Sequence, residues 1–146
     1  LTVTRLAEDR FLVVTGAAPQ IRDMAWLKRH TPADAHCVAT DITSGLPMIA
    51  VMGPKSRALL QKLSGADLSN DAFPFGTSQE IEIGYARVRA SRITYVGELG
   101  WELYMPTEFA RTVFGTAPMG DVEDDVQAAC VAAIGVEAGA ALHDHR

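Results

Sequence analysis

The hydrophobic and polar positions of the chain follow two different periods. Stretches rich in β-branched residues, with apolar and polar positions in alternation, predict β-strands. These lie at residues 2–6, 11–15, 36–41, 48–52, 80–89, 92–96 and 101–105. Apolar residues three and four apart predict helices, which lie at residues 20–30, 54–63 and 107–114. Strands and helices mixed in this order, joined by several tight hairpins, predict an α+β domain with a largely antiparallel sheet.

The character of the sequence changes near its C-terminal end. An acidic stretch is followed there by one that is almost entirely small or apolar. The spacing of Val126, Ala129 and Ala133 fits a helix. We therefore expect a domain over residues 1–114 and a divergent C-terminal segment over residues 115–146 that is helical in part.

The amino-acid composition limits the classes of binding partner that we expect for this chain. The 146 residues carry a formal net charge of -5, and their 13 basic residues are dispersed, so we expect no nucleic-acid partner. No apolar run reaches the roughly 18 residues that a membrane span requires. The two cysteines, Cys37 and Cys130, lack metal-type spacing and predict reduced thiols. His143 and His145 have no evident third ligand, so we expect a frayed terminus and no metal site.

The candidate chemistry lies between Tyr95 and Tyr104. If residues 97–100 form a four-residue hairpin turn, Tyr95 faces Glu102 across the ladder and Ile93 faces Tyr104. These four side chains then share one face of the sheet, with two aromatic rings beside one carboxylate. A carboxylate can accept two parallel hydrogen bonds, and the 2-amino and N3–H groups of a pterin present two such donors. A slip of one residue would separate Tyr95 from Glu102.

The same residues also have an ordinary structural interpretation. A glutamate on a strand is usually solvated, and a tyrosine or tryptophan in a sheet usually belongs to the core. The residue pattern alone leaves both interpretations open.

The run Tyr95-Val96-Gly97-Glu98-Leu99-Gly100-Trp101-Glu102 resembles a motif of the glycine-cleavage T-protein (aminomethyltransferase) family. That motif belongs to the family's folate-binding domain, and here Arg92 precedes it. The segment from Ile49 to Ser56 resembles the family's Gly-Pro-x-Ser helix start, and the likeness covers residues 1–114. The chain is most similar to the folate domains that follow flavin-dependent dehydrogenases of sarcosine and dimethylglycine. Since Leu1 already begins a strand-like segment, we expect a piece of a longer protein.

The resemblance implies that tetrahydrofolate is the cofactor and a methylated amine is the donor. It implies FAD only if the full-length protein has a flavin domain. The cofactor-binding residues it implies are Tyr95, Glu102, Trp101, Tyr104 and Arg92. Glu102 would hold the pterin and Tyr95 would line it. The family's catalytic aspartate belongs to a Gly-rich stretch that this chain does not contain, so no catalytic residue is assigned.

We therefore expect a tetrahydrofolate-binding domain of a one-carbon-transferring enzyme. Its reaction would be aminomethyl transfer or the oxidative demethylation of N-methylated glycines. The alternatives are a non-catalytic folate-binding module and a structural domain without a ligand. The expected compartment is the cytoplasm, or the mitochondrial matrix in a eukaryote.

Overall fold

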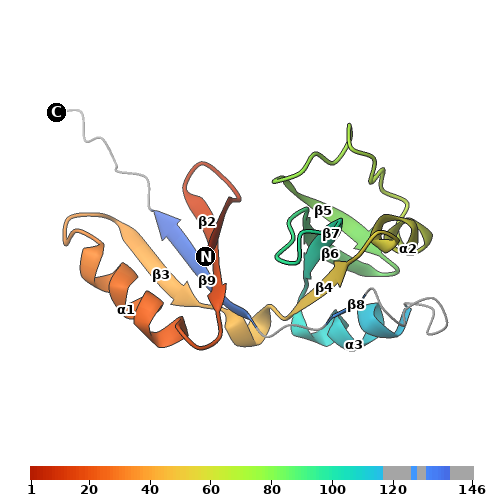
Figure 1. Cartoon of the computed structure of the whole chain (residues 1–146). Helices are drawn as coiled ribbons and strands as arrows, with labels where there is room; N and C mark the ends of the chain where they lie inside the picture. The colour runs from red at the N-terminus through yellow and green to blue at the C-terminus, as the bar shows by residue number, and fades with distance from the viewer. Residues whose placement is uncertain (117–125, 128–130, 139–146) are drawn as a thin grey trace. The chain divides into compact units, whose positions relative to one another are not determined.

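A computed structural model describes residues 1–116, 126–127 and 131–138 (Figure 1). The chain divides into two compact units. The first consists of Leu1–Thr43 with Cys130–Arg146, and the second is Ser44–Ala129. The second unit is therefore inserted into the sequence of the first.

The first unit contains a four-stranded antiparallel sheet and one helix. The strand order is β1-β2-β9-β3. The strands are β1 (Thr2–Arg5), β2 (Arg10–Gly16), β3 (Cys37–Asp41) and β9 (Val131–Ala138). Helix α1 (Gln20–His30) lies against one face of this sheet (Figure 1) and confirms the helix predicted over the same residues.

Strand β9 corrects the expectation of a helix in the C-terminal segment. Residues Val131–Ala138 pair with both β2 and β3, and Leu12 is the partner of Gly135. A glycine weakens a helix, and β-branched residues such as Val131 and Ile134 favour a strand when a sheet offers partners on both sides. The remainder of the predicted helix lies outside the described residues, apart from strand β8 (Val126–Gln127).

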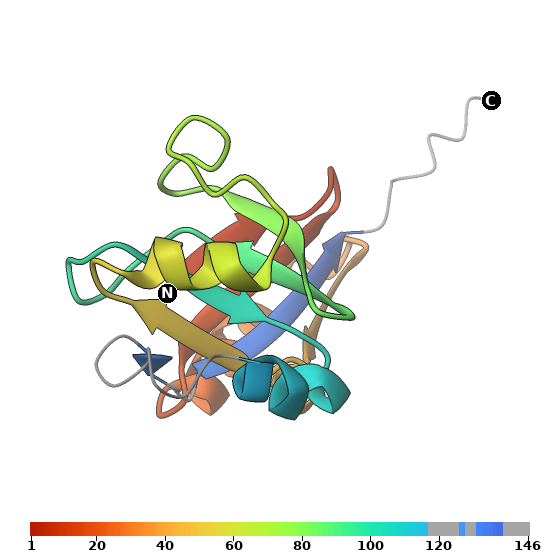
Figure 2. The same ribbon diagram turned by 90° about the vertical axis from the view of Figure 1, so that its right-hand side faces the viewer.

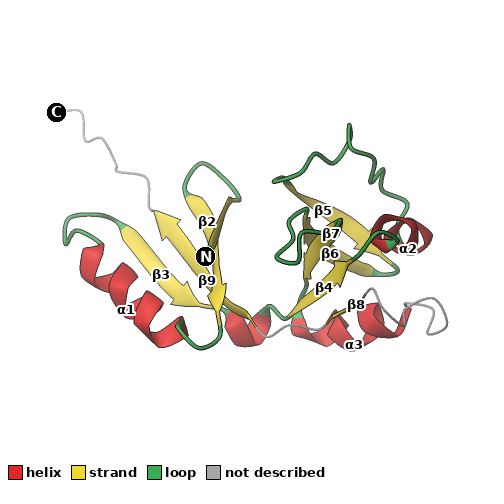
Figure 3. Ribbon diagram, in the orientation of Figure 1, coloured by secondary structure: helices red, strands yellow, loops and turns green. Residues whose placement is uncertain are grey.

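The second unit contains a five-stranded sheet of order β5-β6-β7-β4-β8. Its strands are β4 (Met48–Met52), β5 (Ser78–Ile83), β6 (Ala86–Ser91), β7 (Gly100–Tyr104) and β8 (Val126–Gln127). Its helices are the 3-10 helix η1 (Thr43–Gly45), which begins at the unit boundary, α2 (Ser56–Leu63) and α3 (Thr107–Thr116). All paired strands are antiparallel in both sheets, which confirms the predicted α+β class (Figure 3).

The hydrophobic core of the second unit lies on one face of its sheet. Alternate residues of β4, β6 and β7 point into this core, where α2 covers them (Figure 2). Trp101, Leu60, Phe73 and Val88 are fully buried there. No described helix is long and apolar enough to cross a membrane.

The turn between β5 and β6 differs from the sequence prediction. The pattern predicted one strand over residues 80–89 and the next strand over residues 92–96. In the structure Ile83 pairs with Ala86, so Gly84 and Tyr85 form a two-residue hairpin turn. Gly84 has a φ of 58° at the first central position, as a type II′ turn requires. Ala90 and Ser91 belong to β6, and the strand expected at residues 92–96 is a loop.

The position of β7 beside β4 is anchored at its first residues. The carbonyl oxygen of Leu99 accepts a hydrogen bond of 2.7 Å from the Gly53 N–H and one of 3.1 Å from Ser56 Oγ. Gly100 then pairs with Met52. A Cβ on Gly100 would lie 2.8 Å from Met52 Cγ and 3.2 Å from the Val51 oxygen, so only glycine fits without a shift.

We therefore expect Gly100→Ala to lower the free energy of unfolding by about 1–3 kcal/mol, because the added methyl group enters a packed contact with backbone. Urea denaturation measures this change. Gly65→Ala is the matched control, since a Cβ there meets nothing within 4 Å. Equal stability of the Gly100→Ala variant and the wild type would contradict the close approach of β7 to β4.

Candidate functional site

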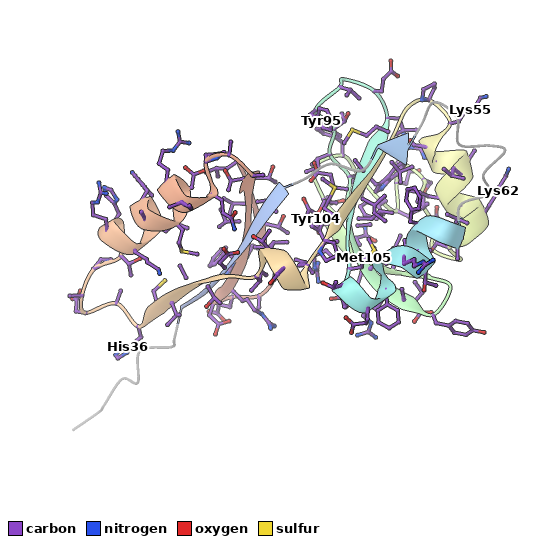
Figure 4. All side chains as sticks on the ribbon, turned by 90° about the horizontal axis from the view of Figure 1, so that it is seen from below. His36, Lys55, Lys62, Tyr95, Tyr104 and Met105 are labelled. Atoms are coloured by element: carbon purple, nitrogen blue, oxygen red, sulfur yellow. The ribbon has the colours of Figure 1, made fainter. Side chains whose placement is uncertain are left out.

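The hairpin interpretation predicted that Tyr95 lies opposite Glu102, and this prediction is wrong. The partner of Glu102 on β6 is Ser91, and the partner of Tyr104 is Arg89. Tyr95 lies in the loop of residues 92–99, where 60% of its surface is exposed (Figure 4). Tyr95 therefore does not belong to the strand pairing in which Glu102 and Tyr104 lie.

Local hydrogen bonds explain why this loop is not a strand. The Val96 N–H donates to Thr94 Oγ1 at 3.2 Å, and the Ile93 N–H donates to the Ser91 oxygen at 3.0 Å. Gly97 has a φ of 79°, which lies outside the extended region of a regular strand. Side-chain bonds of this kind offer the backbone an alternative to a ladder, so β-branched residues here form turns.

Glu102 and Tyr104 lie two residues apart on β7 and therefore point to the same face of the sheet. This face is opposite to the core, because the alternate residues of β7, Trp101 and Leu103, belong to the core. The hydroxyl of Tyr104 donates a hydrogen bond to Glu102 Oε2. The structure therefore brings together two of the predicted site residues.

The neighbours of Glu102 across the sheet are small. Ser91 lies beside it on β6 and Ala50 lies beside it on β4. The preceding residue on the same face of β7 is Gly100. Ser91 and Ala50 were not predicted as neighbours of Glu102, because the predicted hairpin paired Glu102 with Tyr95. The turn at Gly84 was the signal that could have indicated this pairing, because it ends β5 and places residues 86–91 in one strand.

The electrostatic state of the pair follows from its burial. Tyr104 is 2% exposed. Burial raises the pKa of the Tyr104 hydroxyl well above its usual range, and the hydrogen bond to Glu102 and the charge of that carboxylate raise it further. The hydroxyl therefore stays protonated and serves as a donor. Glu102 is half-buried, and no described residue donates a hydrogen bond to its Oε1. The pair can thus accept a hydrogen bond from an N–H donor of a ligand.

Trp101 lies on the opposite face from Glu102 and is fully buried. Phe73 meets its ring edge-on, with the ring centroids 6.1 Å apart. The guanidinium groups of Arg57 and Arg92 lie over the ring at 5.7 and 5.6 Å from its centroid. The structure therefore gives Trp101 core contacts, where the resemblance implied a cofactor contact.

Arg92 is also occupied by the protein itself. Its Nη1 donates to the Phe73 oxygen at 2.6 Å and its Nη2 donates to Asn70 Oδ1 at 2.7 Å. Asn70 Oδ1 also accepts from Arg57 Nη2 at 2.6 Å. Desolvation and the neighbouring charge of Arg57 lower the pKa of Arg92. Arg92 thus ties the loop that contains Asn70 and Phe73 to the start of the loop that contains Tyr95.

Among the described residues, no group of three or more His, Cys, Asp or Glu side chains could hold a metal ion. Cys37 is a half-buried free thiol. Cys130, His143 and His145 lie outside the described residues.

Comparisons with known proteins agree with the motif. The family model of the GCVT N-terminal domain matches residues 1–141. Human mitochondrial dimethylglycine dehydrogenase is 38% identical over 105 residues, which are 71% of this chain and 12% of that protein. The 4-methylaminobutanoate oxidase (formaldehyde-forming) of Paenarthrobacter nicotinovorans is 43% identical over 112 residues, 77% of this chain and 14% of that protein. An aminomethyltransferase of Geobacillus thermodenitrificans is 34% identical over 126 residues, 86% of this chain and 34% of that protein. The chain thus spans about an eighth of the first two relatives and about a third of the last.

Replacement of Arg92 tests its structural contacts. We expect Arg92→Lys to lower the free energy of unfolding by about 1–3 kcal/mol, because an ammonium group cannot reach two acceptors and cover the Trp101 ring together. Urea denaturation measures the loss. Arg87→Lys is the matched control on the same sheet, since Arg87 is exposed and its ion pair with Glu80 is 3.7 Å long. We expect this control variant to change the free energy of unfolding by less than about 0.5 kcal/mol. Equal losses in the two variants would contradict the contacts assigned to Arg92.

Alkaline pH tests the environment of Tyr104. The pKa of Tyr104 is higher in the folded chain than the value of about 10 of an unfolded tyrosine, so the folded chain keeps a proton that the unfolded chain loses. The contribution of this proton to the free energy of unfolding is therefore complete below about pH 10. Above that pH it falls by at most about 1.4 kcal/mol per pH unit. We expect the free energy of unfolding of the wild type to fall more steeply between about pH 10 and 12 than that of Tyr104→Phe. Tyr85→Phe, which changes a residue 98% exposed, should keep the wild-type slope. Identical slopes in all three proteins would contradict the burial of the Tyr104 hydroxyl.

Proposed function

The chain belongs to the GCVT N-terminal domain family, and from this premise we propose that it binds tetrahydrofolate, with Glu102 holding the pterin ring. The observation that carries the proposal is the half-buried carboxylate of Glu102 on the sheet face opposite to the core. Its Oε2 is held by Tyr104, while its Oε1 has no donor in the described part of the chain.

The surroundings of Glu102 fit a flat heterocycle. Its partners on the two neighbouring strands, Ser91 and Ala50, have small side chains, and the larger side chain of Met52 lies beside Gly100. The 2-amino and N3–H groups of a pterin donate two parallel hydrogen bonds, which a carboxylate accepts with favourable geometry. Hydrogen bonds to a charged acceptor are stronger than those to a neutral one. The residues present therefore fit the edge of a pterin.

The other predicted site residues receive different roles in this proposal. Tyr95 is proposed to line the ligand from the loop of residues 92–99. Trp101 and Arg92 are proposed to support β7 from the core face, because their described contacts are with Phe73, Arg57 and Asn70. Tyr104 is proposed to act beside Glu102 on the ligand face.

We propose that the reaction served by this site is the transfer of a one-carbon unit from a methylated amine. Tetrahydrofolate, when bound, supplies the nitrogen atoms that accept such a unit. The residues of this chain would bind and orient the folate, and no catalytic residue is assigned among them. The names of the three relatives are those of an aminomethyltransferase, a dehydrogenase of dimethylglycine and a formaldehyde-forming oxidase. FAD would be needed only if the full-length protein contains a flavin domain.

The proposed compartment is the cytoplasm, or the mitochondrial matrix in a eukaryote. The support for the matrix is that the human relative is named as a mitochondrial protein.

A titration of folinic acid, a stable tetrahydrofolate derivative, into the chain tests the proposal. We expect binding by the wild type and a loss of about 1–3 kcal/mol of binding free energy in Glu102→Gln, because the charged acceptor is replaced by an amide. Isothermal titration calorimetry measures both. Glu82→Gln is the matched control, since Glu82 is exposed on strand β5 of the same sheet. Equal affinities of the wild type and Glu102→Gln would sink the role of Glu102, and absence of binding by the wild type would sink the proposed function of this chain.

A further inference from the structure

We infer that Tyr104 is a positioning residue for Glu102: its hydroxyl holds one carboxylate oxygen and thereby orients the other toward the ligand. The inference rests on the proposed function and adds a second determinant to the same site. It concerns the direction of the carboxylate, which a glutamate on a strand does not control by itself.

The backbone brings the two side chains together. Glu102 and Tyr104 are separated by one residue on β7, so both project from the same face of the strand. Tyr104 is 2% exposed, and its partners on the two neighbouring strands are Arg89 on β6 and Met48 on β4. Met48 is buried, and Arg89 is fixed by an ion pair of 2.7 Å to Glu80. The hydroxyl is therefore presented from a packed ring.

Among the described residues, Tyr104 is the one that donates a hydrogen bond to the carboxylate of Glu102. Its hydroxyl bonds Oε2, and no arginine, lysine or histidine in the described part of the chain forms an ion pair with Glu102. The cation nearest along the sheet, Arg89, is already paired with Glu80. Within the described ranges, the orientation of Glu102 thus depends on its hydrogen bond from Tyr104.

The Tyr104 hydroxyl remains a donor over the physiological pH range. Burial and the adjacent carboxylate both raise the pKa of this hydroxyl, which keeps its proton in place. A fixed carboxylate does not have to lose side-chain freedom when the ligand arrives. Preorganisation of this kind raises affinity without adding a contact to the ligand.

A double-mutant cycle on the full chain tests the inference. Folinic acid is titrated into the wild type, Tyr104→Phe, Glu102→Gln and the double variant. We expect Tyr104→Phe to weaken binding by roughly three- to tenfold, the cost of ordering one side chain on binding. We expect the double variant to bind no more weakly than Glu102→Gln, because the hydroxyl acts through the carboxylate that is already lost. Tyr85→Phe removes a hydroxyl from an exposed ring and should bind as the wild type does.

The outcomes separate this inference from the function on which it rests. If the wild type binds and Glu102→Gln weakens binding while Tyr104→Phe does not, the inference is wrong and the proposed function stands. If the two losses add in the double variant, Tyr104 acts independently of Glu102 and the positioning role is overturned. If the wild type does not bind, both fail.

A spectroscopic measurement keeps the inference testable should Tyr104→Phe fold poorly. The chain contains 3 tyrosines, so 3-fluorotyrosine incorporated into a Tyr85→Phe/Tyr95→Phe background labels Tyr104 alone. We expect its fluorine resonance to shift when Glu102→Gln is introduced, because the acceptor of its hydroxyl changes from a charged to a neutral group. An unchanged resonance would overturn the hydrogen bond on which the inference depends.

Discussion

The pairing of β7 with its two neighbours is the constraint on which the rest of the second unit depends. A strand alternates its side chains, so a shift of one residue would move Trp101 out of the core and Glu102 into it. The backbone fixes this register where β7 begins. The Leu99 oxygen is bound by the Gly53 N–H and by Ser56 Oγ, and Gly100 lies against Met52 without a side chain to separate the strands. The two sequence segments that resemble the T-protein family are therefore in direct contact, and their glycines and serine serve the geometry of the sheet.

The sequence predicted the elements better than their connections. The helix at residues 20–30 and the strand at residues 48–52 were predicted at their observed bounds, because apolar periodicity within one element is a local property. The register around Glu102 was wrong, since it depends on which residues turn. Thr94 and Val96 have the composition of a strand, but a side-chain hydrogen bond between them favours a turn. Strand β9 could not be predicted from spacing, because its stability depends on partners far away in the sequence.

The motif that identifies the family divides its residues between two faces of one sheet. Trp101 contacts Phe73 and two guanidinium groups on the core face, whereas Glu102 contacts Tyr104 on the opposite face. Adjacent residues of the motif thus have different roles. Those on the core face stabilise the strand, and those on the opposite face are available for chemistry. The resemblance correctly indicated the family but could not make this division, because a motif does not record side-chain direction. The acceptor at Glu102 is a local feature of the second unit, while the activity of the relatives belongs to much longer proteins.

The place of β9 in the first sheet has a consequence for how the chain folds. The strand order β1-β2-β9-β3 leaves β3 with β9 as its described neighbour, and residues 42–130, which include the whole second unit, separate the two strands in the sequence. A ribosome delivers the first strands before the strand that joins them, so the early chain presents the open edges of β2 and β3 during synthesis. The second unit is continuous in sequence and can assemble its sheet in that interval. Closing the first sheet then requires contacts of long sequence separation, which form slowly. The arrangement of the two units in the sequence thus allows the inserted unit to fold before the sheet of the other unit is complete.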